Sequence, residues 1–358
     1  MTAYDTLIPI NVITGFLGSG KTTLLARLLK APSLEDTAVL INEFGEVGLD
    51  HHLIEHAQES TLLLDNGCLC CAIRGDLKGA LRDLFSQRER GEIPQFRRVV
   101  IETSGLADPT PIAYTILAEP VLQHHFRLGN IVTVVDAING ATQLKRHPES
   151  VKQAAIADRL VLTKSDAVEE GALPALETAL RRINAAALLL DLDREPLEPD
   201  ALLMQDLYLS EGKEREIDGW LSGFAQASST EASHDHSDGV SSFCLWFDGA
   251  LDWTAFGIWM TMLLNHHGDR VLRIKGMLNV AGVADPVLVN GVQHVVHPPT
   301  HMNGWPDADR RSRLVFIVQN MAQNDIETSL RVFNALVEPS DESHIRTNAT
   351  GELAAGAA

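Results

Sequence analysis

The chain has 358 residues with 48 acidic and 29 basic side chains, and its formal net charge of −19 argues against nucleic acid or an anionic membrane as the main partner. Hydrophobic residues make up 45% and charged residues 22%, as in ordinary globular proteins, and the length is typical of about two domains. Residues 1–10 carry no basic leader and no apolar run is long enough to cross a membrane, so we expect a cytoplasmic protein.

Short apolar runs alternate with helical patterns as far as about residue 190. Their near-continuous apolar character is typical of strands buried on both faces of a parallel sheet. The predicted strands span residues 8–14, 38–42, 61–64, 98–102, 131–136, 159–163 and 187–190. Between them, apolar residues such as Leu77, Leu81 and Leu84 recur at helical spacing. The pattern predicts an α/β domain with a doubly wound, mostly parallel sheet, spanning residues 1–224.

Residues 225–242 are rich in Ser, Ala, Asp and His, which cannot support a core, and they predict a flexible linker. A smaller domain is expected over residues 243–339, followed by a disordered tail over residues 340–358. Its predicted strands lie near residues 243–247, 271–277, 287–296 and 313–319, and its predicted helices span residues 253–266 and 325–336. Strands that follow one another without helices between them indicate a mainly antiparallel α+β domain.

A glycine-rich segment, GFLGSGKT from Gly15 to Thr22, follows the first predicted strand and opens the first predicted helix. Its backbone N–H groups and the helix N-terminus suit phosphate oxygens. We predict that Lys21 reaches the β- and γ-phosphates of a nucleotide and that Thr22 ligates Mg²⁺. The remaining predicted phosphate-loop residues are Gly15, Gly18, Ser19, Gly20 and Thr23. The alternative, a chance glycine loop, is disfavoured by the strand and helix on either side.

A second phosphate-side element is the buried strand ending in Glu102, followed by Gly105. Glu102 stands where P-loop proteins place the acid that orients Mg²⁺ and water, so we predict that Glu102 acts in catalysis together with Lys21. Gly105 is predicted to offer its N–H to the γ-phosphate. Asp50, which follows a glycine-containing turn, is a further candidate for the Mg²⁺ site.

The sequence Thr163-Lys164-Ser165-Asp166 follows a later predicted strand, where P-loop GTPases carry an Asn/Thr-Lys-x-Asp element. A carboxylate at Asp166 accepts hydrogen bonds from N1–H and N2–H₂ of guanine but would face a lone pair at N1 of adenine. The element therefore predicts GTP rather than ATP. A surface Lys/Asp pair is the alternative, and the upstream phosphate loop favours the functional interpretation.

Three of the four cysteines, Cys68, Cys70 and Cys71, stand within four positions. Thiolates are soft ligands for Zn²⁺ and its neighbours, and a turn after a strand could aim two or three sulfurs at one ion, with Glu43 or Glu46 nearby. Buried reduced thiols are the alternative. His234 and His236 in the predicted linker are left open between weak metal binding and solubility.

In chain order, the segments GFLGSGKTT, INEFGEVGLD, NGCLCC, ETSGLADP, TKSD and VLRIKGM resemble the CobW family of P-loop GTPases. The resemblance implies a GTPase domain, a smaller CobW C-terminal domain, and GTP hydrolysis coupled to binding and delivery of zinc, cobalt or iron. It places the metal on Cys68, Cys70 and Cys71, with Glu46 as a further ligand. Ile41 departs from relatives that carry an acid there, and the two linker histidines do not match a high-capacity metal store.

We therefore expect a GTP- and GDP-binding metallochaperone that hydrolyses GTP with Mg²⁺ and hands Zn²⁺ or Co²⁺ to an apo-metalloprotein client. Two alternatives remain: an activator dedicated to one enzyme, such as a nitrile hydratase, or to cobalamin synthesis, and a thiol redox protein with a vestigial nucleotide site. The physiological metal, the client and a homodimeric state are left open by the sequence.

Overall fold

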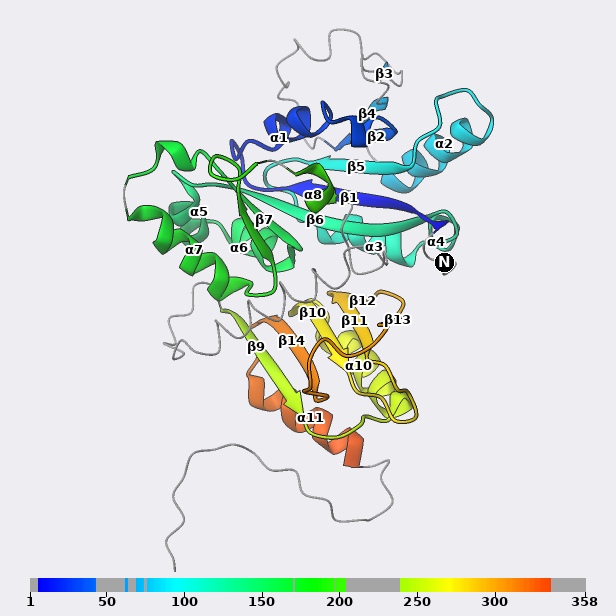
Figure 1. Cartoon of the computed structure of the whole chain (residues 1–358), viewed down its shortest axis with the longest axis vertical. Coiled ribbons are helices and arrows are strands. Elements are labelled where there is room, and N and C mark those ends of the chain that lie inside the picture. Colours follow the sequence, from blue (N-terminus) through cyan, green and yellow to red (C-terminus); the bar gives the residue numbers. More distant parts are fainter. Residues whose placement is uncertain are drawn as a thin grey trace, which may run out of the picture.

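The computed structural model describes residues 6–42, 62–63, 69–73, 76–169, 171–196, 198–203 and 239–335. Two sheets organise these residues, one in each half of the chain, with the first domain above the second in Figure 1. Among the described residues, no helix combines the length and the apolar character that crossing a bilayer requires.

The strands of the first sheet run in the order β3-β4-β2-β5-β1-β6-β7-β8. They are β1 (Ile8–Thr14), β2 (Thr37–Asn42), β3 (Leu62–Leu63), β4 (Leu69–Ile73), β5 (Arg98–Thr103), β6 (Phe126–Asp136), β7 (Arg159–Thr163) and β8 (Leu188–Asp191). Neighbouring strands are parallel, except that β3 is antiparallel to β4. Because parallel strands end at one edge of the sheet, the loops that follow β1, β5, β6, β7 and β8 gather there.

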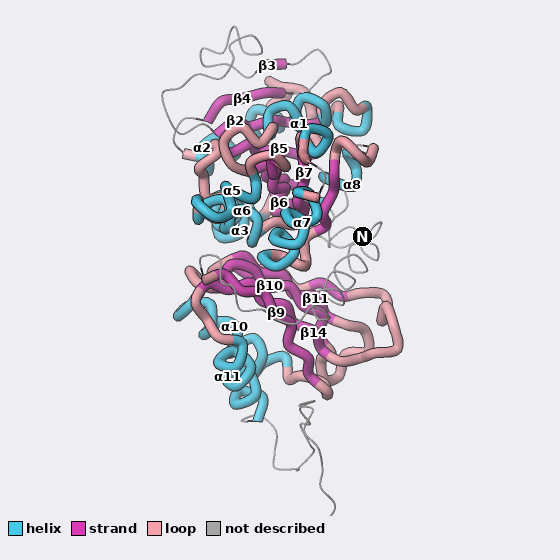
Figure 2. Tube along the Cα trace, turned by 90° about the vertical axis from the view of Figure 1, so that its left-hand side faces the viewer, coloured by secondary structure: helices cyan, strands magenta, loops and turns pink. Residues whose placement is uncertain are grey.

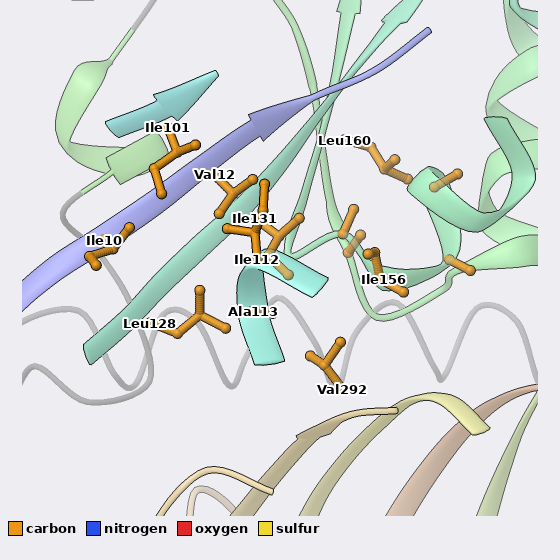
Figure 3. Packing of buried hydrophobic residues seen from close by; sticks show 14 of the residues in the cluster. Ile10, Val12, Ile101, Ile112, Ala113, Leu128, Ile131, Ile156, Leu160 and Val292 are labelled. Atoms are coloured by element: carbon orange, nitrogen blue, oxygen red, sulfur yellow. The ribbon is translucent and has the colours of Figure 1, made fainter. Parts of the chain in front are cut away.

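Helices cover both faces of this sheet. They are α1 (Lys21–Leu28), α2 (Leu77–Glu89), α3 (Thr110–Ala118), α4 (Pro120–Gln123), α5 (Gly140–Arg146), α6 (Pro148–Ile156), α7 (Ala172–Ile183) and α8 (Pro199–Leu203). Leu81, Ile112 and Ile156 pack on one face with Ile10 and Val12, as Figure 3 shows for part of the cluster. The helices α1 and α8 pack on the other face. The predicted doubly wound α/β domain is confirmed.

The second sheet is antiparallel and runs in the order β12-β11-β10-β14-β9, with β13 paired to β11. Its strands are β9 (Val240–Phe247), β10 (Val271–Leu278), β11 (Val287–Val292), β12 (Val295–Val296), β13 (Thr300–His301) and β14 (Ser312–Gln319). The helices α10 (Trp253–His267) and α11 (Gln323–Ala335) pack on one of its faces. The predicted antiparallel α+β domain is confirmed.

Two predicted boundaries in this domain were wrong. Residues 287–296 do not form one strand, because Gln293 adopts a left-handed backbone (φ 49°) and reverses the chain between β11 and β12. β9 begins at Val240 rather than near Phe243, because Ser241 and Ser242 pair with Val318 and Ile317 of β14. Backbone pairing there overrides the weak strand propensity of serine.

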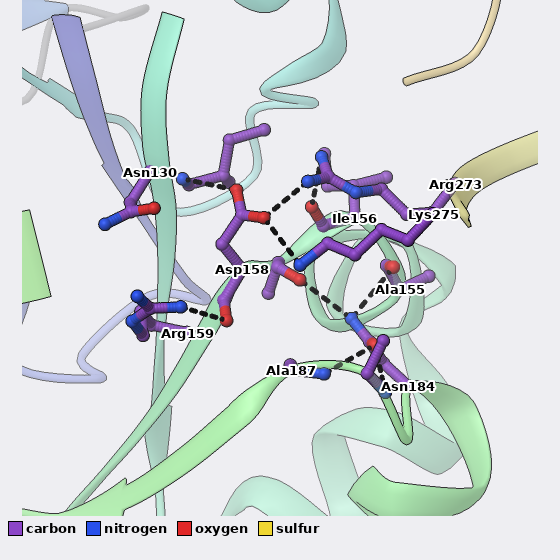
Figure 4. A network of polar contacts seen from close by, with 12 residues as sticks. Asn130, Ala155, Ile156, Asp158, Arg159, Asn184, Ala187, Arg273 and Lys275 are labelled. Atoms are coloured by element: carbon purple, nitrogen blue, oxygen red, sulfur yellow. Dashed lines mark hydrogen bonds and ion pairs between the residues drawn. The ribbon is translucent and has the colours of Figure 1, made fainter. Parts of the chain in front are cut away.

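The free face of the second sheet packs on the first domain, so that the sheet lies between that domain and α10 and α11 (Figure 2). Leu272, Val292 and Ile317 enter the hydrophobic core of the first domain. A polar network adjoins this apolar contact, where Arg273 and Lys275 of β10 reach Asp158, which follows α6 (Figure 4). Asn184 binds the last turn of α6 through the carbonyls of Ala154 and Ala155.

The predicted cysteine turn needs correction. Cys70 and Cys71 lie within strand β4, and their Cα atoms pair with those of Val39 and Leu40 in β2. The segment Leu69–Ile73 is apolar throughout, and a continuous apolar run is typical of a strand in a parallel sheet rather than of a turn.

Candidate functional site

The phosphate loop connects the end of β1 to the start of α1, which Gly20 caps. Gly15 adopts φ 139°, and a Cβ atom there would lie 2.2 Å from the carbonyl oxygen of Val134. Only glycine therefore fits at this bend, because the loop passes directly over the backbone of β6. The loop is closed by a hydrogen bond from the N–H of Ser19 to the carbonyl of Phe16, at 3.2 Å.

Lys21 points into this loop. Its Nζ atom donates hydrogen bonds to the carbonyl oxygens of Gly15 (2.9 Å) and Phe16 (3.1 Å), and its side chain is largely buried. Burial lowers the pKa of Lys21, and the nearby charge of Glu102 opposes this effect. An ammonium group held inside a glycine loop at a helix N-terminus is suited to bind phosphate oxygens.

Thr22 and Glu102 meet beside Lys21. The hydroxyl of Thr22 donates to Oε1 of Glu102 at 2.6 Å, and Glu102 is 4% exposed at the end of β5. A hydroxyl and a carboxylate oxygen are hard donors of the kind Mg²⁺ binds next to nucleotide phosphates, so this pair fits the cation. The structure thus brings together two residues that stand 80 positions apart in the sequence.

The loop after β5 touches the phosphate loop directly. A Cβ atom on Gly105 would lie 2.6 Å from the backbone nitrogen of Leu17, so the two loops are in contact at this point. Gln153 of α6, which is 1% exposed, donates from Nε2 to the carbonyls of Gly105 (3.2 Å) and Ala107 (2.9 Å). Gln153 was not predicted from the sequence, since a single polar residue in a helix carries no recognisable pattern.

The predicted base-recognition element lies on the other side of the phosphate loop. Thr163 donates from Oγ1 to the carbonyl of Ser19 at 2.8 Å, and Lys164 donates from Nζ to the carbonyl of Gly18 at 2.8 Å. Lys164 has φ 59° and is followed by the short 3-10 helix η4 (Ser165–Ala167), which leaves Asp166 exposed. The two residues Thr163 and Lys164 thus hold the start of this element against the phosphate loop, and Asp166 is exposed to solvent.

Asp136, at the end of β6, fixes Lys164 through an ion pair of 2.7 Å. Burial raises the pKa of Asp136, but hydrogen bonds from Lys164 and Asn139 outweigh burial and hold this pKa below its usual value. Asp136 was not singled out from the sequence, although its place at the end of an apolar run was a usable signal.

Several predicted site residues lie outside the described residues. They are Glu46 and Cys68 of the predicted zinc site, Asp50 of the predicted Mg²⁺ site, and His234 and His236. Cys70 and Cys71 are described only as part of β4. Among the described side chains, no three from His, Cys, Asp and Glu are arranged to hold a metal ion.

The doubly wound sheet and the phosphate loop define a P-loop nucleotide-binding protein with an added antiparallel domain. The family model described as CobW/HypB/UreG, nucleotide-binding domain, matches residues 9–191, and the model described as cobalamin synthesis protein cobW C-terminal domain matches residues 240–334. The chain belongs to the CobW family, as its motifs predicted.

Similar proteins span both domains. The zinc chaperone YjiA of Escherichia coli is 32% identical over 90% of this chain and 97% of its own length. The zinc chaperone CobW of Pseudomonas aeruginosa is 30% identical over 90% of this chain and 91% of its own. The crystal structure of Zn(II)-bound YjiA GTPase from E. coli superposes with a TM-score of 0.69 and 29% identity, covering 91% of this chain and 99% of that one.

Proposed function

We propose that this protein hydrolyses GTP and uses its nucleotide state to control the binding of Zn²⁺ and its transfer to an apo-metalloprotein client. The geometry at the sheet edge supports the GTPase part, and relatives named as zinc chaperones support the metal part. The proposed place of action is the cytoplasm, where thiols are kept reduced and remain able to bind metal.

The phosphate-side residues have separate roles. Lys21 exchanges the carbonyls of its own loop for β- and γ-phosphate oxygens, and the N–H of Gly105 donates to the γ-phosphate. Thr22 and Glu102, with Asp50 as a third proposed ligand, would hold Mg²⁺, whose charge offsets that of the phosphates. The carboxylate of Glu102 also orients the attacking water. GTP is converted to GDP and phosphate.

Asp166 selects the base. It accepts hydrogen bonds from N1–H and N2–H₂ of guanine, while adenine would present a lone pair to the same oxygen. Lys164, whose Nζ atom is fixed by Gly18 and Asp136, holds the start of this element against the phosphate loop.

The observation that carries the link between nucleotide and metal is the pairing of three strands. Leu40 of β2 is aligned with Cys71 of β4 on one side and with Ile101 of β5 on the other. Two strand spacings amount to roughly 10 Å, so the backbone of Cys71 lies that far from the residue preceding Glu102. We propose that Cys68, Cys70, Cys71 and Glu46 bind the zinc ion. Because successive residues of a strand face opposite sides of the sheet, zinc binding by both Cys70 and Cys71 requires β4 to open locally. We also propose that the γ-phosphate changes the affinity of this zinc site through residues 43–50, which follow β2.

The test is a competition titration of Zn²⁺ against a chromogenic chelator, with GDP and with a non-hydrolysable GTP analogue. Typical coupling is about 1–3 kcal/mol, a change of roughly 5- to 150-fold in affinity, and by linkage zinc must change the affinity for the analogue by the same factor. The double variant Cys70→Ser/Cys71→Ser should lose zinc binding, because a hydroxyl is a poor substitute for a soft thiolate.

Cys244→Ser is the matched control. Cys244 lies in β9, where burial raises the pKa of its thiol to about 12 despite the charge of Arg313, so forming the thiolate that metal binding requires is harder there than at an ordinary cysteine. Loss of zinc affinity in this control as well would point to misfolding. Equal zinc affinities with GDP and with the GTP analogue would overturn the proposed switch.

A further inference from the structure

Two carboxylates that lie outside the sequence Thr163–Asp166 also hold the base-recognition element. β8 runs parallel to β7, with Asp191 aligned with Leu162, so the end of β8 lies beside the element. The hydroxyl of Ser165 donates to Oδ1 of Asp191 at 2.6 Å, and the N–H of Ser165 donates to Oδ2 of Asp193 at 2.9 Å. Asp191 and Asp193 together are called the carboxylate clamp below.

The two acids of the clamp are joined by a hydrogen bond. The N–H of Asp193 donates to Oδ1 of Asp191 at 3.0 Å, so the two acids form one turn at the end of the strand. Asp191 and Ser165 are both buried, whereas Asp193 lies at the exposed outer side of the turn. Nε of Arg194 lies 3.4 Å from Oδ2 of Asp191, and the guanidinium offsets part of the negative charge of the clamp. Hydrogen bonds to carboxylates are stronger than those to neutral acceptors.

Ser165 stands immediately before Asp166, so the clamp fixes the backbone that carries the base-reading carboxylate. On the preceding side, Lys164 is tied to the carbonyl of Gly18 and to Asp136. The three-residue helix η4 is too short to hold its own conformation, because one turn of helix is unstable in isolation. Asp166 is exposed, so its placement depends on these two anchors.

We propose that Asp191 and Asp193 are positioning residues for guanine selection, which act on the base only through Ser165 and Asp166. This inference rests on the proposed reading of guanine by Asp166. Without the clamp, Asp166 would have to be ordered each time GTP binds, and the entropy lost would weaken binding. The phosphate side is untouched, so the loss appears in KM for GTP rather than in kcat. Adenine makes no hydrogen bond to Asp166, so KM for ATP does not change.

The experiment measures steady-state hydrolysis of GTP and ATP by the full chain carrying Asp193→Ala or Ser165→Ala. Asp193→Ala removes the acceptor for the N–H of Ser165. Ser165→Ala keeps that N–H but removes the hydroxyl, which donates to Oδ1 of Asp191 at 2.6 Å and to Oδ2 of Asp193 at 3.4 Å. Each is expected to raise KM for GTP about three- to tenfold, the range for one hydrogen bond, with kcat and KM for ATP unchanged. Glu195→Ala, an exposed acid in the same turn, is the control and should behave as wild type.

A loosened phosphate loop would instead raise KM for both nucleotides, and that outcome would overturn the proposal. A second measurement uses the Asp166→Asn background, which should favour XTP, since an amide donor matches the acceptor at C2 of xanthine. Adding Asp193→Ala should raise KM for XTP by the same factor as for GTP in the parent. An unchanged KM for XTP in that double variant would also overturn the positioning role of the clamp.

The guanine-reading role of Asp166 and the positioning role of the clamp fail in different ways. If wild type does not prefer GTP over ATP, or if Asp166→Asn leaves the preference intact, the proposed reading of guanine by Asp166 is wrong, and the clamp loses its role with it. If the preference depends on Asp166 but Asp193→Ala and Ser165→Ala both behave as wild type, only the positioning role is overturned.

Discussion

Nζ of Lys275 lies 3.0 Å from Oδ1 of Asp158, and the two residues belong to different domains. Arg273 binds the same oxygen, and Oδ2 of Asp158 accepts the N–H of Ile131 at 3.0 Å. Burial raises the pKa of Asp158, but Arg273 and Lys275 outweigh burial and hold this pKa well below its usual range. The carboxylate is therefore charged at neutral pH and ties the second sheet to the first domain.

Asp158→Asn should weaken this domain contact severely. The variant leaves Arg273 and Lys275 buried at the interface without their shared carboxylate, and breaking a buried ion pair from one side costs about 3–5 kcal/mol. Urea unfolding at pH 7 measures the loss. The control is Asp248→Asn. Asp248 is exposed, and its Oδ1 atom lies 4.0 Å from Nε of Arg311. Such a surface ion pair contributes roughly 0–1 kcal/mol to stability. Similar urea midpoints for the two variants would contradict the assignment of Asp158.

His297 should make stability depend on pH. Burial and the charge of Arg273 lower the pKa of His297 to about 3; Asp158 opposes this, while Lys275 and Arg127 add to it. The unfolded chain takes up the proton near pH 6.5 and the folded protein only near pH 3. The unfolding free energy should therefore fall as pH drops through this window, by up to about 1.4 kcal/mol per pH unit.

The check is urea unfolding of wild type and His297→Gln at pH 7, 6 and 5. The glutamine variant should lose less stability per pH unit, because its side chain does not titrate. His266→Gln, at the exposed end of α10, is the control and should keep the wild-type slope. An unchanged slope in His297→Gln would rule out this source of acid sensitivity.

Two glycines of the phosphate loop should respond differently to alanine. Gly15→Ala places a methyl group 2.2 Å from the carbonyl of Val134, so the loop or β6 must shift, and both stability and nucleotide binding should fall. Gly18 has φ 73°, but a Cβ atom there would have no neighbour within 4 Å, so Gly18→Ala should cost only the backbone strain, about 1–2 kcal/mol. Thermal unfolding compares the two, and an equal loss would show that the close contact at Gly15 is unimportant.

Lys21→Ala should abolish measurable GTP turnover while the circular dichroism spectrum stays as in wild type. The variant removes the ammonium from the phosphate loop, and with it the charge that stabilises the transferred phosphoryl group. Lys30→Ala, an exposed lysine just after α1, is the matched control. Turnover that survives in Lys21→Ala at the level of this control would refute the assignment of the phosphate loop.

The sequence by itself determined the fold class and the phosphate-side site. Continuous apolar runs such as Val99–Ile101 identify buried parallel strands, and the spacing from Gly15 to Thr22 identifies the loop, because both signals are local and depend on neighbouring residues only. The element Thr163 to Asp166 was recognisable for the same reason.

Only the tertiary structure decided which distant residues meet. Cys70 and Cys71 form part of a strand rather than a turn because β2 pairs with their backbone, and no local pattern in the sequence specifies that partner. Asp158 and Arg273 stand 115 positions apart, and Ser165 and Asp191 stand 26 apart. A single charged or polar residue has no periodicity, so its role depends on the strand order and register that bring its partner within hydrogen-bonding distance.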